Sequence, residues 1–183
     1  MIQIEILLGI IDLFEEYNIE YMITGSFASN LHGFPRATFD ADVVIKAEVE
    51  SLEQLTNEIS KDFYVEKAFD EEILDKQGMF NIIHYETGFK IDIIFIKRRG
   101  FSRTEFDRRQ LINFAGCRCW FSSPEDTILS KLEWAKLGGS ERQFNDALGV
   151  AKVQSEKLDW TYIRKWAKEL NVIELLDKIL RIL

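Results

Sequence analysis

The 183-residue chain carries 31 acidic and 23 basic side chains, which gives a formal net charge of −8 at pH 7. This charge argues against general coating of nucleic acid, because such binding depends on lysines and arginines that neutralise phosphates. A hydrophobic content of 46% is ample for a packed core and excludes a largely disordered chain. The two cysteines, Cys117 and Cys119, lack a matching set of metal-ligating residues, which favours free thiols in the cytoplasm.

The first predicted element is an amphipathic helix over residues 2–17, where apolar side chains recur at helical spacing. The stretch also contains four acidic residues and has no basic leader. These features argue against a signal peptide or a membrane-spanning segment. We therefore expect a cytoplasmic protein without a membrane partner.

A short strand, a tight turn and a helix are predicted next. Tyr21 to Thr24 form the strand, Gly25 permits the turn, and Ser26 opens a helical segment over residues 27–31. Backbone N–H groups at the start of such a helix point away from it and suit a phosphate group. After a loop that contains Gly33 and Pro35, the chain enters a second strand.

This second strand carries Asp40 and Asp42. Side chains alternate along a strand, so Ala41, Val43 and Ile45 should face the core while both aspartates share the opposite face. Two carboxylates about 7 Å apart on one face can hold a divalent cation between them.

The middle of the chain alternates between strand and helix patterns. We predict helices at residues 50–60, 70–75 and 102–109. We predict strands at residues 63–65, 79–85, 89–96, 111–114 and 118–121. The strands at 79–85 and 89–96 are expected to pair as a hairpin, because only a short turn with Gly88 joins them.

Asp92 interrupts the apolar run from Ile91 to Ile96, which is typical of a central strand. A buried carboxylate at this position costs several kcal/mol unless a cation or hydrogen-bond donors compensate it. A metal ion shared with Asp40 and Asp42 would do so. The alternative is an edge strand on which Asp92 faces water and pairs with Lys90 on the same face.

From Ser123 onward only helices are predicted, over residues 123–137, 140–155, 159–170 and 172–183. Ser123 and Pro124 are typical of a helix start. We therefore predict an α+β protein with a core at residues 1–122 and a helical lobe at residues 123–183, packed together with any cleft between them facing the aspartates.

The order of these motifs resembles the nucleotidyltransferase superfamily of DNA polymerase β. Gly25-Ser26 is followed by Asp40-x-Asp42 on a strand and by Asp92 on a later hydrophobic strand. The loop motif His32-Gly33-x-x-Arg36-x-Thr38 and the later Pro124-Glu125-Asp126 are similar to the abortive-infection and type IV toxin branch. The resemblance spans residues 2–150 and implies a mixed β-sheet flanked by helices, followed by a helical lobe.

The resemblance also implies the roles of individual residues. Nucleotide-binding residues would be Gly25, Ser26, Arg36, Thr38, Lys131 and Asp146. Asp40, Asp42 and Asp92 would bind two Mg²⁺ ions, with Mn²⁺ as the alternative, and together with Lys131 they would be the catalytic residues. Asp92 would also accept the proton of the attacking hydroxyl. Arg36 is expected to replace a basic residue that this branch often has in the helix after Gly-Ser.

The implied reaction transfers a nucleoside monophosphate from an NTP to an acceptor hydroxyl and releases pyrophosphate. The acceptor is a protein, a small molecule or a tRNA; the acidic charge and the lack of a basic stripe favour the first two. A toxin–antitoxin or phage-defence role would add a cognate antitoxin or toxin as partner. The tryptophans suggest core packing, or a face for a homodimer. The alternative function is a noncatalytic nucleotide-sensing or partner-binding module on the same fold.

Several of these residues also have a purely structural interpretation. Lys131 could be an ordinary helix-surface residue, and Asp146 could form an i, i+4 pair with Arg142. We interpret His32 as a loop residue that forms hydrogen bonds and His84 as a half-buried strand residue, and assign neither to a metal.

Overall fold

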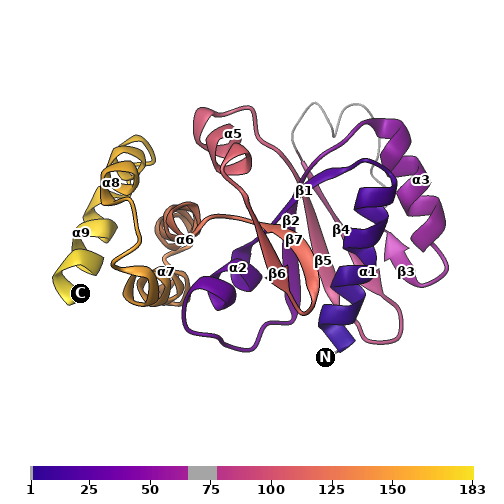
Figure 1. The fold of residues 1–183 in the computed structure, drawn as a ribbon, viewed down its shortest axis with the longest axis horizontal. Helices are drawn as coiled ribbons and strands as arrows, with labels where there is room; N and C mark the ends of the chain where they lie inside the picture. The colour runs from indigo at the N-terminus through magenta and orange to yellow at the C-terminus, as the bar shows by residue number, and fades with distance from the viewer. Residues whose placement is uncertain (1, 66–77) are drawn as a thin grey trace. The chain divides into compact units, whose positions relative to one another are not determined.

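The computed structural model describes residues 2–65 and 78–183, and the short helix expected at residues 70–75 lies outside them. The helices are α1 (Ile2–Glu16), α2 (Gly25–His32), α3 (Val49–Ile59), α5 (Gly100–Asp107), α6 (Pro124–Gly138), α7 (Glu141–Gln154), α8 (Trp160–Glu169) and α9 (Ile173–Ile182). The strands are β1 (Glu20–Thr24), β2 (Asp40–Lys46), β3 (Phe63–Val65), β4 (Met79–His84), β5 (Lys90–Phe95), β6 (Gln110–Phe114) and β7 (Cys117–Phe121). Figure 1 shows these elements in chain order.

The described strands form one mixed sheet in the order β3-β4-β5-β2-β1-β7-β6. β4 and β5 pair antiparallel, as expected for a hairpin, and β6 and β7 do the same. β2 and β5 run parallel, although they are distant in sequence. The combination of this sheet with the helices confirms the predicted α+β class. β5 lies between two other strands, so the edge-strand alternative for Asp92 is wrong.

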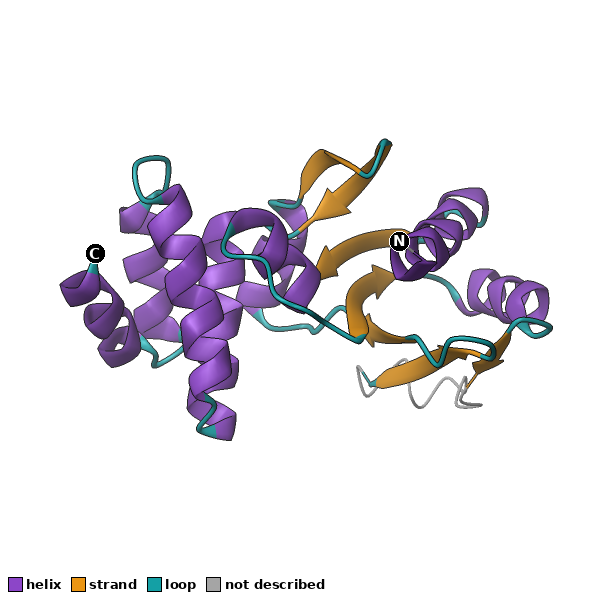
Figure 2. Ribbon diagram, turned by 90° about the horizontal axis from the view of Figure 1, so that it is seen from below, coloured by secondary structure: helices purple, strands orange, loops and turns teal. Residues whose placement is uncertain are grey.

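One face of the sheet is covered by α1 and α3 (Figure 1, Figure 2). Ala41, Val43 and Ile45 of β2 are fully buried, as the alternation predicts. α1 contributes Leu7, Ile10, Ile11 and Phe14 to the same core. The aspartates of β2 are therefore on the face of the strand opposite these buried residues. In the part of the chain that the structure describes, no helix has the length and apolar character needed to cross a membrane.

The chain divides into two compact units that do not follow the sequence continuously. Unit 1 consists of residues 1–23 and 38–121, and unit 2 consists of residues 24–37 and 122–183. Residues 24–37 therefore group with the C-terminal helices, and residues 38–121 group with α1 and β1.

In unit 2, α2 packs against α6 and α7. Helix α6 begins as the sequence predicts, with Pro124 in its first turn and the Ser123 hydroxyl accepting a hydrogen bond from the Asp126 N–H at 3.2 Å. The apolar sides of the helices form the core of the unit. Its fully buried members include Ile128, Leu129, Leu132, Ala147, Val150, Ile163 and Leu176.

Gly33, directly after α2, is in close contact with the backbone of α7. A Cβ atom at this position would lie 2.7 Å from the Val150 nitrogen and 2.9 Å from the Gly149 carbonyl carbon. Only a residue without a side chain fits, and this close approach fixes the start of the loop that leads to Arg36.

We expect Gly33→Ala to lower the free energy of unfolding by about 1–3 kcal/mol, because overpacking forces one backbone away from the other. Chemical denaturation measures the loss. The matched control is Gly9→Ala in the interior of α1, where a Cβ meets nothing within 4 Å. Because alanine has the higher helix propensity, this variant should be neutral or more stable. Equal stability of both variants would contradict the close packing.

Candidate active site

Four polar side chains form an array on one face of the two central strands β2 and β5. In the parallel register, Asp40 is the partner of Lys90 and Asp42 is the partner of Asp92. Because side chains alternate along each strand, all four point to the face opposite the buried Ala41. We call Asp40, Asp42 and Asp92 the acidic face. The structure therefore brings together the three carboxylates that the sequence analysis selected.

Asp92 is the most buried of the three, with 7% of its surface exposed. One of its oxygens, Oδ2, accepts a hydrogen bond from the Lys90 ammonium at 2.7 Å. The other, Oδ1, is buried and accepts no hydrogen bond from any described residue. The carboxylate is thus buried on a central strand, and it is paired with Lys90 on the same face of that strand.

The Lys90 ammonium forms an ion pair with this buried carboxylate. Its hydrogen bond to Asp92 raises the pKa of Lys90; burial opposes the shift, and the charges of Asp92, Asp40 and Asp42 add to it. The amine is therefore firmly protonated at neutral pH. We gave Lys90 no functional role from sequence, although its i, i+2 spacing from Asp92 already placed it on the same face.

The acidic face has the right chemistry for a hard divalent cation, since carboxylate oxygens are the ligands that Mg²⁺ prefers. The buried Oδ1 of Asp92 is an acceptor that such an ion would satisfy. With the side chains as they stand, no group of three or more His, Cys, Asp or Glu residues within 2–65 and 78–183 is arranged to hold a metal. Lys90 supplies the compensating charge instead.

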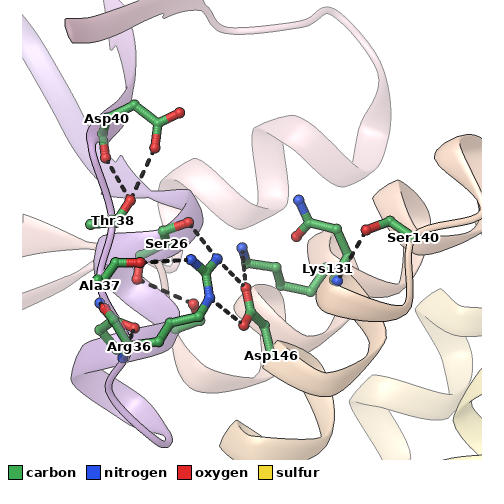
Figure 3. A network of polar contacts seen from close by, with 11 residues as sticks. Ser26, Arg36, Ala37, Thr38, Asp40, Lys131, Ser140 and Asp146 are labelled. Atoms are coloured by element: carbon green, nitrogen blue, oxygen red, sulfur yellow. Dashed lines mark hydrogen bonds and ion pairs between the residues drawn. The ribbon is translucent and has the colours of Figure 1, made fainter.

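Thr38 orients the first aspartate of the pair. Its hydroxyl lies 3.0 Å from Oδ1 of Asp40 and 3.1 Å from the Asp40 carbonyl oxygen, and it can donate to either (Figure 3). We expected Thr38 to bind nucleotide; the contact that the structure shows is with Asp40.

In unit 2, Gly25 begins helix α2 with a φ of 59°, a left-handed conformation that favours glycine. Thr24 precedes it in extended conformation and provides no side-chain cap. The first N–H groups of the helix are therefore left for another acceptor, or for solvent. The next residue, Ser26, accepts a hydrogen bond on its hydroxyl oxygen from Nη2 of Arg36 at 2.9 Å.

Asp146 on α7 is bound by two cations from different parts of unit 2 (Figure 3). Arg36 donates to it from Nε and from Nη2, both at 2.8 Å, in a bidentate pair. Lys131 on α6 donates from Nζ at 2.9 Å. The side chain of Lys131 is 4% exposed and that of Asp146 is 8% exposed, so both charges are removed from water.

The charge state of Asp146 follows from these contacts. Burial alone would raise the pKa of Asp146, but the hydrogen bonds and positive charges of Arg36 and Lys131 outweigh it and hold the pKa below its usual value. Asp146 is therefore ionised at neutral pH. Lys131 is a buried residue rather than the surface lysine that the sequence allowed, and the described partners of Asp146 are these two cations, not Arg142.

The loop that carries Arg36 is held at its backbone as well. The Asn30 side chain donates to the Arg36 carbonyl at 2.8 Å and accepts from the Arg36 N–H at 3.0 Å. This double contact fixes the backbone of Arg36, from which the side chain extends to Asp146. Sequence reasoning missed Asn30, because an asparagine near the end of a short helix has no distinctive pattern.

The histidine of the loop motif is a structural residue. His32 is the last residue of α2, where it is buried, and not a loop residue as we expected. Its Nε2 lies 2.8 Å from the Ser122 carbonyl oxygen, which can only accept, so Nε2 carries the hydrogen. Burial lowers the pKa of His32, although the hydrogen bond to Ser122 and the charge of Glu125 oppose the shift. His84 forms a hydrogen bond with Thr87.

The Pro124-Glu125-Asp126 motif also has a structural explanation. Asp126 is fully buried and accepts hydrogen bonds from the hydroxyls of Ser123 and Tyr162. Glu125 accepts one from the Asp159 N–H at the start of α8. The motif thus joins the start of α6, the helix that carries Lys131, to α8.

Comparison with solved structures identifies the fold. The chain is similar to an antigenic nucleotidyltransferase-like protein from Paracoccidioides brasiliensis, with a TM-score of 0.61 and 19% identity over 92% of this chain and 82% of that one. It is also similar to the antibiotic-resistance factor ANT(2″)-Ia, with a TM-score of 0.58 and 15% identity over 96% and 91% of the two chains. A third match is the lincosamide antibiotic adenylyltransferase LnuA, with a TM-score of 0.55 and 14% identity over 80% and 95%.

No family model matches the chain, and no curated protein matches it in sequence. The identities with the solved structures are all below 20%, so the likeness is one of backbone architecture. The chain has the nucleotidyltransferase fold that the sequence resemblance implied.

Proposed function

We propose that the protein is a metal-dependent nucleotidyltransferase that transfers a nucleoside monophosphate from an NTP to an acceptor hydroxyl and releases pyrophosphate. The observation that carries the proposal is the acidic face: three carboxylates in adjacent register on the central strands of a sheet with the nucleotidyltransferase fold. Clustered acids repel one another, so such a face is costly to keep without a cation.

In this proposal, Asp40, Asp42 and Asp92 hold divalent cations, two Mg²⁺ ions or Mn²⁺ in their place. Bound there, the ions would stabilise the attacking and leaving oxygens at the α-phosphate. Asp92 accepts the proton of the acceptor hydroxyl, directly or through water. Its buried Oδ1 has no described hydrogen-bond partner, which leaves that oxygen available for a ligand.

We assign the phosphate groups of the NTP to residues of unit 2. Helix α2 begins at Gly25 without a side-chain cap from Thr24, and the N-terminus of a helix favours an anion. Arg36 and Lys131 are buried or half-buried cations, and Asp146 holds both at fixed positions. A cation that is already positioned loses less side-chain freedom when phosphate binds. Thr38 acts on the acidic face through its hydrogen bond to Asp40.

The direct test is pyrophosphate release from each of the four NTPs. We expect release with Mg²⁺ or Mn²⁺, complete loss when EDTA removes the metal, and recovery when excess MgCl₂ is added back. Heat-denatured protein is the control for contaminating metal or phosphate chemistry. Release that continues unchanged in EDTA would contradict the metal assignment.

The acceptor is tested with the same labelled NTPs in separate incubations with lysate protein, total tRNA and small hydroxylated molecules such as aminoglycosides. The net charge of −8 favours a protein or a small molecule over a large RNA. One of the similar structures is a lincosamide adenylyltransferase, which also favours a small-molecule acceptor.

A toxin–antitoxin or phage-defence role is tested by toxicity on expression in a heterologous host.

The second candidate is a noncatalytic module that binds nucleotide or a partner on the same fold. One observation favours it: Asp92 and Asp146 are both bound to lysines of the chain itself. It predicts Mg²⁺-dependent NTP binding by calorimetry without pyrophosphate release, whereas the enzyme shows both.

A further inference from the structure

The contact between Lys90 and Asp92 has a geometry that bears on how a metal ion reaches the acidic face. The two residues lie two positions apart on β5, and their partners across the parallel register are Asp40 and Asp42. One corner of a four-residue array is therefore a cation and the other three are carboxylates. The ammonium is hydrogen-bonded to Oδ2 of Asp92, an oxygen that would also be available as a ligand to a divalent ion.

The two partners differ in how easily they can move. The Asp92 side chain is 9% exposed and is fixed within a strand that has neighbours on both sides. The Lys90 side chain is 38% exposed and carries its charge at the end of a flexible four-carbon stem. When something displaces this ion pair, the lysine can move into water while the aspartate stays in place.

The ammonium also leaves the carboxylate only partly satisfied. Lys90 binds Oδ2 at 2.7 Å, whereas the buried Oδ1 has no described hydrogen-bond donor. A lysine is a single point charge and cannot bind both oxygens as a planar arginine would. A doubly charged ion with several ligand positions satisfies such a carboxylate better.

We propose that Lys90 is the internal counter-ion of the acidic face, which holds Asp92 in the metal-free protein and moves into solvent when a divalent ion binds. Lys90 is thus a positioning residue that acts through Asp92 and competes with the metal. The proposal rests on the metal-binding role of the acidic face in the proposed function. It adds that the metal affinity of this protein is set by a competing residue of its own chain.

The test is calorimetric titration of the metal-free protein with Mn²⁺ in the absence of NTP. We expect Lys90→Met, which keeps the length of the side chain and removes its charge, to bind Mn²⁺ about tenfold more tightly than the wild type. We also expect the metal-free variant to melt at a lower temperature than the wild type and to gain more from added Mn²⁺. Lys46→Met is the matched control, because Lys46 lies on β2 but pairs with Glu20.

A double-mutant cycle separates competition for Asp92 from a general effect of charge. In the Asp92→Asn background, Lys90→Met should change Mn²⁺ affinity by less than about twofold, because the carboxylate to which Lys90 is hydrogen-bonded has been removed. A tenfold effect that persists in this background would overturn the proposal. Should Lys90→Met fail to fold, Lys90→Arg carries the test: its bidentate guanidinium holds Asp92 more firmly and should weaken Mn²⁺ binding several-fold.

The remaining outcomes distinguish this inference from the proposed function. Mn²⁺ binding that is lost in Asp40→Asn but equal in wild type, Lys90→Met and Lys90→Arg would overturn the role of Lys90 and leave the metal site intact. Absence of Mn²⁺ binding in every variant would overturn both.

Discussion

Asp42→Asn should lower the rate of nucleotide transfer by about 1,000-fold, which corresponds to about 4 kcal/mol of transition-state stabilisation. The substitution keeps the size and shape of the side chain but removes the charge that would hold a divalent ion. Asp42 shares the acidic face with Asp40 and is the register partner of Asp92. The substitution therefore removes the negative charge that lies between the other two carboxylates of the acidic face. The measurement is the initial rate of pyrophosphate release at saturating NTP and Mg²⁺.

The control for this loss is Asp12→Asn on the exposed side of α1, which removes the same charge from the same unit. It should leave the rate within about twofold of the wild type, because exposed charges away from a site have small effects. Both variants should unfold near the wild-type temperature, so lost activity cannot be attributed to unfolding. A fully active Asp42→Asn protein would rule out the proposed role of the acidic face.

Asp146→Asn should be the most destabilising of the substitutions considered, with a loss of about 3–5 kcal/mol in the free energy of unfolding. The variant leaves the 4%-exposed Lys131 without its carboxylate, and it removes the bidentate partner of Arg36. An uncompensated buried charge is costly, whereas the intact ion pair is close to neutral in its net contribution. Urea denaturation followed by circular dichroism measures the loss.

Asp177→Asn provides the matched comparison within the same unit. Asp177 pairs with Arg164 at 3.4 Å, and both side chains are about half exposed. Such a surface pair contributes about 0–1 kcal/mol, so this variant should be nearly as stable as the wild type. If both variants lost the same stability, burial of the Asp146 cluster would not be the reason.

The contribution of Asp146 to the free energy of unfolding should decrease at low pH. The pKa of Asp146 is held below its usual value by Arg36 and Lys131, so the carboxylate contributes stability above about pH 4. This contribution is lost as the pH falls through the lowered pKa. The stability difference between wild type and Asp146→Asn should therefore be constant near neutral pH and shrink in acid.

The sequence pattern within each single strand was enough to predict which side chains belong to the acidic face. Alternation placed Ala41 and Val43 in the core and the aspartates opposite them, and the structure confirms it. The apolar run around Asp92 indicated a central strand, and β5 is one. These predictions succeed because a strand in a half-buried sheet has only two faces, so composition determines which one is buried.

Contacts between distant segments could not be predicted in this way. Arg36 and Asp146 are 110 positions apart, and nothing in either neighbourhood indicates the other. The nearest plausible partner of Asp146 was Arg142, one helical turn away, and local reasoning selected it as the structural alternative. In the same way, the assignment of residues 24–37 to unit 2 depends on how α2 packs against α6 and α7.

Unit 2 is built from two segments that are far apart in the sequence, residues 24–37 and 122–183. This arrangement limits the order in which the parts of the protein can fold. During synthesis Arg36 is made 110 residues before Asp146, a delay of roughly 5–20 s at typical elongation rates. Throughout that interval α2 and its loop lack the complete α7, one of the two helices against which α2 packs. Ribosome-bound chains that end before α7 should thus expose this segment to protease, while the finished chain protects it. For the same reason, a fragment cut after Phe121 contains residues 24–37 without the C-terminal helices of the unit to which they belong.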